Sequence, residues 1–204
     1  MTYSLLKFAH VLGAILIGAG LIGVWMSDLR SRQLRELHAF SEAVRSIAVF
    51  YDGVVVPGAI LLLASGGWMI WAYYGGWGFL EVPWLAGMVA LFAFEFIEGN
   101  TVTRVYFMRL RRITREALRQ GAITPELEAA RGEGVPTFTH FLDLPILFVI
   151  VALGTLRPTD WTLFLVGSGI AILIAAVLTL TIPRLYPWGE AGPDGDPGRP
   201  GRPA

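Results

Sequence analysis

Five long apolar stretches alternate with polar segments along this chain. They lie at Ser4–Met26, Gly53–Tyr74, Val82–Met108, Phe138–Leu156 and Trp161–Ile182. A helix needs about 20 mainly apolar residues to cross the roughly 30 Å hydrocarbon core of a bilayer, and each stretch meets or approaches that length. The pattern predicts an all-α fold, a polytopic membrane protein whose residues 1–186 form a bundle of five transmembrane helices.

The segments that join these stretches have patterns of their own. Ser27–Ile47 carries apolar residues at helical spacings among charged ones. It is either a helix that extends the first span or lies on the membrane surface, or a solvated connector. Arg109–Leu118 is expected to continue the third helix, and the glycines and prolines of residues 121–136 to form a loop. Residues 187–204 are predicted to be a disordered Gly/Pro-rich cytoplasmic tail.

Arginines are concentrated after the first and third stretches, whereas the segment between the second and third contains neither Lys nor Arg. Short loops rich in Lys and Arg stay in the cytoplasm. We therefore expect a multi-pass membrane protein with its N-terminus outside and its C-terminus in the cytoplasm. No small-residue cleavage site follows the first stretch, so we expect it to be retained as a helix.

Composition supports the membrane assignment and excludes several other classes. The chain is 54% hydrophobic with a mean hydropathy of +0.59, which indicates lipid as the main contact of its surface. Its 16 basic and 16 acidic residues cancel, so nothing points to nucleic acid as a partner. The absence of cysteine excludes disulfides, thiolate metal sites and covalently attached c-type haem.

His10 is the first polar residue that lipid would not favour. It lies three residues after Lys7 in the first apolar stretch, about 10 Å below the predicted outer helix end. A buried imidazole needs a partner. His10 is therefore a candidate haem ligand, metal ligand or proton carrier, or a histidine bonded to a neighbouring helix.

A second set of polar residues lies in the third and fourth stretches. Glu95 and Glu98, and likewise His140 and Asp143, are three residues apart, a spacing that puts both members on one helix face. Glu98 and Asp143 lie about 21 and 20 Å from the outer helix ends, so the two pairs can meet at one depth. Desolvation there favours neutral carboxyls or pairing with a base.

Three interpretations of this cluster stay open. Glu95, Glu98, His140 and Asp143 offer the oxygen and nitrogen ligands of a divalent transition-metal site. The same residues suit a proton relay. They also suit a structural network, joined by Asp52 and Arg104, in which Arg104 neutralises Glu98 and His140 bonds to Asp143. A single haem held by both His10 and His140 is excluded, because their depths differ by about 14 Å.

Several sequence features resemble a known family. They are the opening residues Tyr3–Ala14, the pairs Pro57-Gly58 and Gly66-Gly67 of the second stretch, and Leu153–Pro158 at the end of the fourth. Together they resemble the bacterial predicted integral membrane proteins of domain-of-unknown-function family 2269, over roughly residues 1–185. The resemblance implies an integral protein of the bacterial cytoplasmic (inner) membrane and no particular activity.

The Lys7-x-x-His10 opening also resembles HemJ-type membrane protoporphyrinogen oxidases and CopD-type copper-resistance proteins. The HemJ-type resemblance implies that His10 binds haem b. This chain has Glu95 and Glu98 where HemJ-type proteins carry a lysine-bearing, histidine-rich helix, so protoporphyrinogen oxidation does not follow from it.

Three functions fit these features. The first is an integral membrane protein with a buried polar site, associated with haem or redox chemistry through His10. The second is a small transporter or proton-coupled carrier that uses the Glu95, Glu98, His140 and Asp143 cluster. The third is a non-catalytic subunit of a membrane complex. Besides the lipid bilayer, the partner is then another membrane protein or a second copy of the chain.

Overall fold

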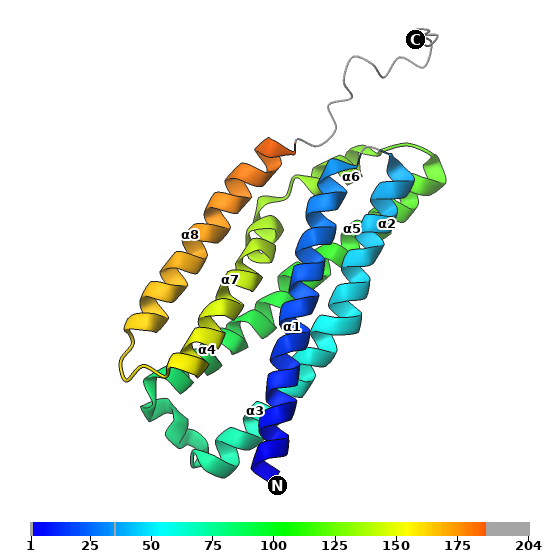
Figure 1. Ribbon diagram of the computed structural model, residues 1–204. Helices are drawn as coiled ribbons and strands as arrows, with labels where there is room; N and C mark the ends of the chain where they lie inside the picture. The colour runs from blue at the N-terminus through cyan, green and yellow to red at the C-terminus, as the bar shows by residue number, and fades with distance from the viewer. Residues whose placement is uncertain (1, 35, 187–204) are drawn as a thin grey trace, which may run out of the picture.

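The computed structural model describes residues 2–186 except residue 35, and the whole described chain is built from helices and short connections. Figure 1 shows long helices that run roughly side by side, with the N-terminus at one end of the bundle. The elements, in order, are α1 (Thr2–Gln33), α2 (Leu37–Phe50), the π-helix η1 (Tyr51–Val55), α3 (Val56–Tyr73), the 3-10 helix η2 (Gly76–Glu81), α4 (Pro83–Glu98), the π-helix η3 (Gly99–Thr103), α5 (Arg104–Gln120), α6 (Pro125–Arg131), α7 (Gly134–Leu156) and α8 (Thr162–Leu185).

The prediction of an all-α membrane bundle is confirmed. Within the described residues, five helices are long and apolar enough to cross a membrane, and two of them are composite. Leu37–Tyr73 joins α2, η1 and α3, and Pro83–Gln120 joins α4, η3 and α5. The outward face of α8 exposes large apolar side chains such as Leu165, Ile172 and Leu173, as a lipid-facing helix requires.

Helix α7 is the most enclosed of the five spans. In its most apolar window 61% of the residues are buried, compared with 11% for α8. It packs against α8, α4 and α1, and Figure 1 shows it between α8 and α1. Of the five spans, α7 is thus the one best placed to carry polar side chains away from lipid.

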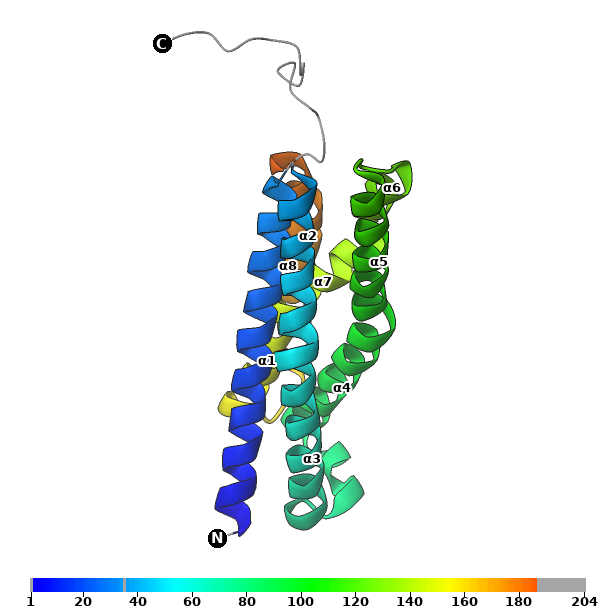
Figure 2. The same cartoon turned by 90° about the vertical axis from the view of Figure 1, so that its right-hand side faces the viewer.

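The end of the bundle formed by the last turns of α1 with α2, α5 and α6 carries most of the arginines, and we call it the arginine-rich end. It has a hydrophobic core of its own. Most of the described part of Ser27–Ile47 is helical: α1 continues to Gln33, and α2, which begins at Leu37, is the amphipathic start of the second span. Helix α5 continues to Gln120 as predicted and ends at Gly121, whose φ of 69° suits a glycine. Figure 2 shows α2 and α5 as separate columns at this end. The buried core between them includes Phe40, Val44, Ile47, Tyr106, Phe107, Leu110, Ile113, Ala117, Leu127 and Ala130.

The predicted loop after α5 contains a short helix, α6, which is a difference from the expectation. Thr124 caps it by accepting a hydrogen bond from the Leu127 backbone N–H at 3.2 Å, and Pro125 starts its first turn. The Arg131 guanidinium lies 4.2 Å from the centre of the Phe40 ring, and burial lowers the Arg131 pKa to about 10. A capping residue and an anchoring arginine therefore hold this segment as a helix.

The remaining boundaries follow the prediction closely. Helix α7 begins at Gly134, before the expected Phe138, and ends at Leu156 as expected. Helix α8 covers Thr162–Leu185. The tail prediction for residues 187–204 lies outside the described residues.

Helices α1 and α3 cross at a pair of glycines. A Cβ atom on Gly13 would lie 2.8 Å from the Leu62 backbone nitrogen, and one on Gly58 would lie 2.8 Å from the Leu16 Cβ. Both distances are shorter than real Cβ contacts. The two backbones can approach this closely only because neither position has a side chain.

We expect Gly13→Ala to destabilise the bundle by about 1–3 kcal/mol, because the new methyl group would push α1 away from α3. Gly67→Ala is the matched control, since Gly67 lies in α3 and a Cβ atom there would have nothing within 4 Å. Thermal unfolding of both variants in mild detergent measures the difference. Equal unfolding temperatures would refute the close glycine crossing.

Candidate functional site

A cavity of about 170 Å³ lies inside the membrane-spanning part of the bundle. We call it the acidic cavity, because two carboxylic residues, Glu95 of α4 and Asp143 of α7, contribute to its wall. Most of the remaining wall is apolar. Its lining residues are Ile17, Leu21, Tyr51, Val55, Val56, Ala59, Ile60, Phe92, Glu95, Phe96, Gly99, Asn100, Asp143, Leu147 and Ile150.

The carboxyl groups at this cavity differ in how they are satisfied. Asp143 is only 2% exposed, and no hydroxyl, amide or basic group among the described residues donates to its carboxyl oxygens. The Glu98 carboxyl lies within hydrogen-bonding reach of Asp143, so these two acids can pair only by sharing a proton. Glu95 Oε1 is likewise buried without a partner. Glu98, just outside the lining, accepts a hydrogen bond of 2.7 Å from the Thr103 hydroxyl. The cavity therefore holds unused acceptors on Glu95 and Asp143, which can take up a proton or a donor-bearing ligand.

Glu95 and Glu98 are the acidic neighbours of Asp143. None of the ion pairs in the described part of the chain joins these three carboxyls to a base. Arg104, which the structural-network interpretation assigned to Glu98, forms its ion pair with Asp52 at 3.0 Å. Three carboxyls thus share a poorly solvated region without a paired cation, an arrangement that favours binding of a proton or another positive charge.

Both π-helices border the acidic cavity. The segment η1 contributes Tyr51 and Val55 to the lining, and η3 contributes Gly99 and Asn100. A π-turn is wider than an α-turn and leaves carbonyls in need of donors. In η3, the Asn100 side-chain amide donates to the Phe96 carbonyl at 2.7 Å, and the Thr101 hydroxyl donates to the Ile97 carbonyl at 2.7 Å. Polar residues after Glu98 therefore stabilise the wide turn inside the membrane.

A hydrogen bond between Tyr51 and Gly99 joins the two π-segments. The Tyr51 hydroxyl donates a hydrogen bond of 2.8 Å to the Gly99 carbonyl. A Cβ atom on Gly99 would lie 2.6 Å from that hydroxyl oxygen, so the contact needs a glycine. Because Tyr51 has one phenolic proton and donates it to the Gly99 carbonyl, it does not donate a hydrogen bond to the carboxyls of the cavity.

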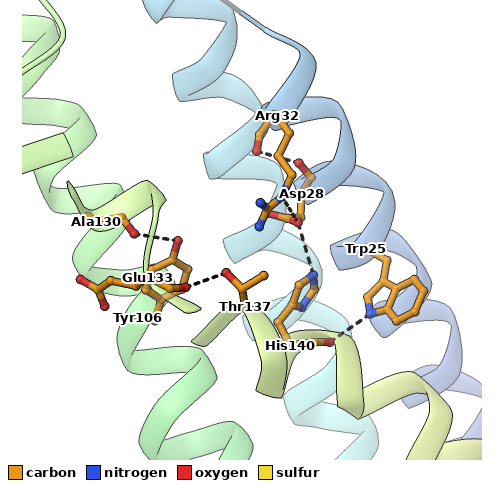
Figure 3. Close-up of polar contacts among 9 residues, drawn as sticks. Trp25, Asp28, Arg32, Tyr106, Ala130, Glu133, Thr137 and His140 are labelled. Atoms are coloured by element: carbon orange, nitrogen blue, oxygen red, sulfur yellow. Dashed lines mark hydrogen bonds and ion pairs between the residues drawn. The ribbon is translucent and has the colours of Figure 1, made fainter. Parts of the chain in front are cut away.

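A second buried polar group, the Asp28 cluster, comprises Asp28, Arg32 and His140 and lies nearer the arginine-rich end (Figure 3). Arg32 Nε donates to Asp28 Oδ2 at 2.8 Å, and His140 Nε2 lies 3.7 Å from the same oxygen. All three residues are at most 5% exposed. The Trp25 indole donates to the His140 carbonyl at 3.1 Å, which ties α1 to α7 at this level.

The four residues predicted to form one cluster are thus divided between the acidic cavity and the Asp28 cluster. The charged neighbours of His140 are Asp28 and Arg32, whereas those of Asp143 are Glu95 and Glu98. The structure brings Glu95, Glu98 and Asp143 together, and it places His140 with the Asp28 cluster. It also leaves Asp52 and Arg104 as a half-exposed pair beside η1 and η3.

Four polar residues at these sites are not identified by sequence reasoning. Asp28 and Arg32 fall in a segment predicted to connect two spans, although their i,i+4 spacing is that of a helical ion pair. Tyr51 lies just before the predicted second span, and Thr103 lies in the third. The available signal for Thr103 is the polar run Gly99–Thr103, which is unusual inside a transmembrane helix.

Among the residues that the structure describes, no group of three or more His, Asp or Glu side chains is arranged to hold a metal ion. The metal interpretation of Glu95, Glu98, His140 and Asp143 stays a prediction. The unpartnered oxygens of Glu95 and Asp143 are the feature that most restricts what the site can bind.

His10 lies at the α1–α3 interface. Its Nδ1 is 3.3 Å from the Ser65 hydroxyl oxygen, and its ring packs over Gly66, where a Cβ atom would lie 3.0 Å from Cε1. Another cavity, an almost wholly apolar groove of about 450 Å³, lies between α7 and α8. His10 lines neither this groove nor the acidic cavity. The assignment of His10 as a haem b ligand stays a prediction.

The Asp28 cluster makes a testable contribution to stability. We expect Arg32→Met to destabilise the protein by about 3–5 kcal/mol, because it leaves the buried Asp28 carboxylate without its cation. Adding Asp28→Leu to Arg32→Met removes the uncompensated charge, so the double variant should recover much of the loss. Thermal unfolding in detergent measures both effects.

Arg45→Met is the matched control for this series, since the Arg45–Glu42 pair is 66% and 73% exposed and exposed pairs contribute at most about 1 kcal/mol. An Arg32→Met variant as stable as Arg45→Met would show that the buried pair does not hold α1 in place. A double variant less stable than Arg32→Met alone would contradict the charge argument.

Comparison with known proteins agrees with this architecture. No curated protein and no solved structure matches the chain. A family described as predicted integral membrane protein (DUF2269) matches residues 4–158, which include α1 to α7 and both polar sites. The chain is a multi-pass integral membrane protein that belongs to this DUF2269 family.

Proposed function

We propose that this protein is a small proton-linked carrier in which the carboxyls of the acidic cavity bind the transported or coupling proton. The observation that carries the proposal is Asp143, which is buried in the most enclosed helix beside a cavity, has no basic partner, and can pair with its acidic neighbour Glu98 only by sharing a proton. Ionisable residues inside membrane spans commonly mark ion and substrate pathways. Burying a carboxyl group without a partner costs folding free energy. Binding a proton or a ligand during the transport cycle offsets that cost.

The roles of the residues follow from their contacts. Asp143 and Glu95 offer free oxygens to the cavity, so they are the proton-binding groups. Glu98 is held by the Thr103 hydroxyl and acts as the fixed acidic neighbour that favours proton uptake by the other two. The π-segments widen the helices at this level, which supports an assignment of the cavity as the site where binding occurs.

The proposal is tested by proton flux in liposomes that contain the purified protein and a trapped pH indicator. With a potassium diffusion potential as driving force, the wild-type protein should acidify or alkalinise the lumen faster than protein-free liposomes. Asp143→Asn and Glu95→Gln should reduce the flux to the protein-free rate, because an amide cannot exchange the proton.

Glu81→Gln is the matched control, since Glu81 is an exposed acid of η2 outside the cavity lining. It should leave the flux unchanged. Equal flux in the wild-type protein and both cavity variants would refute the carrier. Co-purification with a larger membrane complex would then favour the alternative of a non-catalytic subunit.

The haem-associated function of His10, which the HemJ-type resemblance implies, is a separate proposal. His10 faces Ser65 and Gly66 of α3 rather than the acidic cavity. The carrier proposal therefore does not depend on haem, and the two can be tested independently.

We also propose that the protein lies in the bacterial cytoplasmic membrane with its N-terminus outside. The arginine-rich end includes Arg30, Arg32 and most of the α5 arginines, whereas residues 75–82 around η2 contain neither Lys nor Arg. Five spans place the two ends of the membrane domain on opposite faces. The positive-inside rule then favours a cytoplasmic position for α6 and for the end of α8.

Single cysteines test this orientation directly, because the chain contains no cysteine of its own. Gly78→Cys, at an exposed position in η2, should react with a membrane-impermeant maleimide in intact cells. Gln120→Cys, at the exposed end of α5, should react only after the membrane is opened. The reverse labelling pattern would contradict the proposed orientation.

A further inference from the structure

The acidic cavity has a lateral mouth between α3 and η3. Its lining includes Ile60 of α3, Phe96 of α4 and Asn100 of η3, all of which are exposed. Ile60 is 60% exposed and Phe96 is 39% exposed. Both residues lie within membrane-spanning helices, and α4 leans away from α3 as it rises toward α5 (Figure 2). The mouth therefore faces the lipid rather than an aqueous end of the bundle.

The acidic cavity presents more hydrogen-bond acceptors than donors. Three carboxyl oxygens, on Glu95 and Asp143, receive no hydrogen bond from a hydroxyl, amide or basic group of the described residues, and the one neighbour that can pair with Asp143 is another acid, Glu98. The Tyr51 hydroxyl donates to Gly99, and the Asn100 amide donates to Phe96. A ligand that complements this site must bring N–H donors and positive charge, because the protein already supplies acceptors and negative charge.

The size and lining of the cavity restrict the ligand further. A volume of about 170 Å³ holds a small polar head with a few carbon atoms, given that a protein cavity of about 150 Å³ is large enough to bind benzene. Around the carboxyls the wall is apolar, with Leu21, Phe92 and Leu147 among its residues. Such a wall favours a head group that is attached to hydrocarbon.

We propose that the acidic cavity binds the ammonium head of an amphiphilic primary amine, whose apolar tail passes between Ile60 and Phe96 into the lipid. The ammonium group replaces the missing donors with up to three N–H groups directed at Asp143 and Glu95. This inference rests on the carrier proposal, since it names the substrate class of the same carboxyl site. A proton and an ammonium group then compete for the same oxygens, which is how their movements become coupled.

The test uses the full-length protein in mild detergent with octylamine as the probe. A ligand that binds only the folded state raises the unfolding temperature. Octylamine should therefore raise the unfolding temperature of the wild-type protein with increasing concentration. Octanol and octanoate have the same chain length and partition into detergent, but they lack the ammonium group, so they should give no such rise.

Variants locate the binding. Asp143→Asn and Glu95→Gln should abolish the rise caused by octylamine, and Glu81→Gln should keep it, because Glu81 is an exposed acid outside the cavity. Ile60→Trp should abolish it by filling the mouth. Leu63→Trp, on the same helix at a 51% exposed position outside the lining, should not.

The outcomes separate this inference from the carrier proposal. If octanol stabilises the protein as much as octylamine does, or if Asp143→Asn responds like the wild-type protein, the amine site is refuted. Proton flux that depends on Asp143 would still support the carrier in that case. If octylamine binds through Asp143 while the wild-type protein and Asp143→Asn give the same proton flux with octylamine on one side of the membrane, the amine site stands and the carrier is refuted.

Discussion

Lipid offers no hydrogen bonds to a carboxyl group or to a backbone carbonyl that has left its helical partner, so every polar group in the span must be covered by protein. The arrangement of this bundle follows from that constraint. Helix α7 carries His140 and Asp143, and it is the most enclosed of the five spans. Helices α1, α4 and α8 surround it. The surrounding spans are thus placed so that the helix that carries His140 and Asp143 is kept from lipid.

The same constraint explains which parts of the fold could be predicted. Long apolar runs suffice for α1, α3 and α8, because almost any such run must be helical in a membrane. The runs of α4 and α7 contain acids and a histidine, so their assignment also needed the expectation that these polar residues face the bundle interior. The continuation of the third span into α5 was expected from its own sequence, whereas the extent of α2 was harder to infer. Residues 37–50 and 104–120 are amphipathic and continue past the apolar runs, since α2 and α5 bury their apolar faces against each other. Such pairing between distant segments is not visible in either segment alone.

The polar site was predictable in depth but not in direction. Counting residues from the helix ends places Glu98 and Asp143 at the same level, and the structure brings them together. The residue count could not show that the His140 side chain lies toward α1. Two residues three apart on a helix differ by about 60° around its axis, and that angle is enough to give His140 and Asp143 different neighbours in a tightly packed bundle. The partner of each residue depends on where α1 and α4 lie, which the local sequence of α7 does not contain.

Helix α8 has a consequence of a different kind. The DUF2269 match ends at residue 158, before α8 begins, and α8 packs mainly on α7 without contributing to the acidic cavity or the Asp28 cluster. A bundle of four spans has both ends on one face of the membrane, whereas a fifth span moves the second end to the other face. By changing the number of crossings from even to odd, α8 puts its own C-terminal end on the face of the membrane opposite to the N-terminus of α1, and it can do so without altering the polar interior.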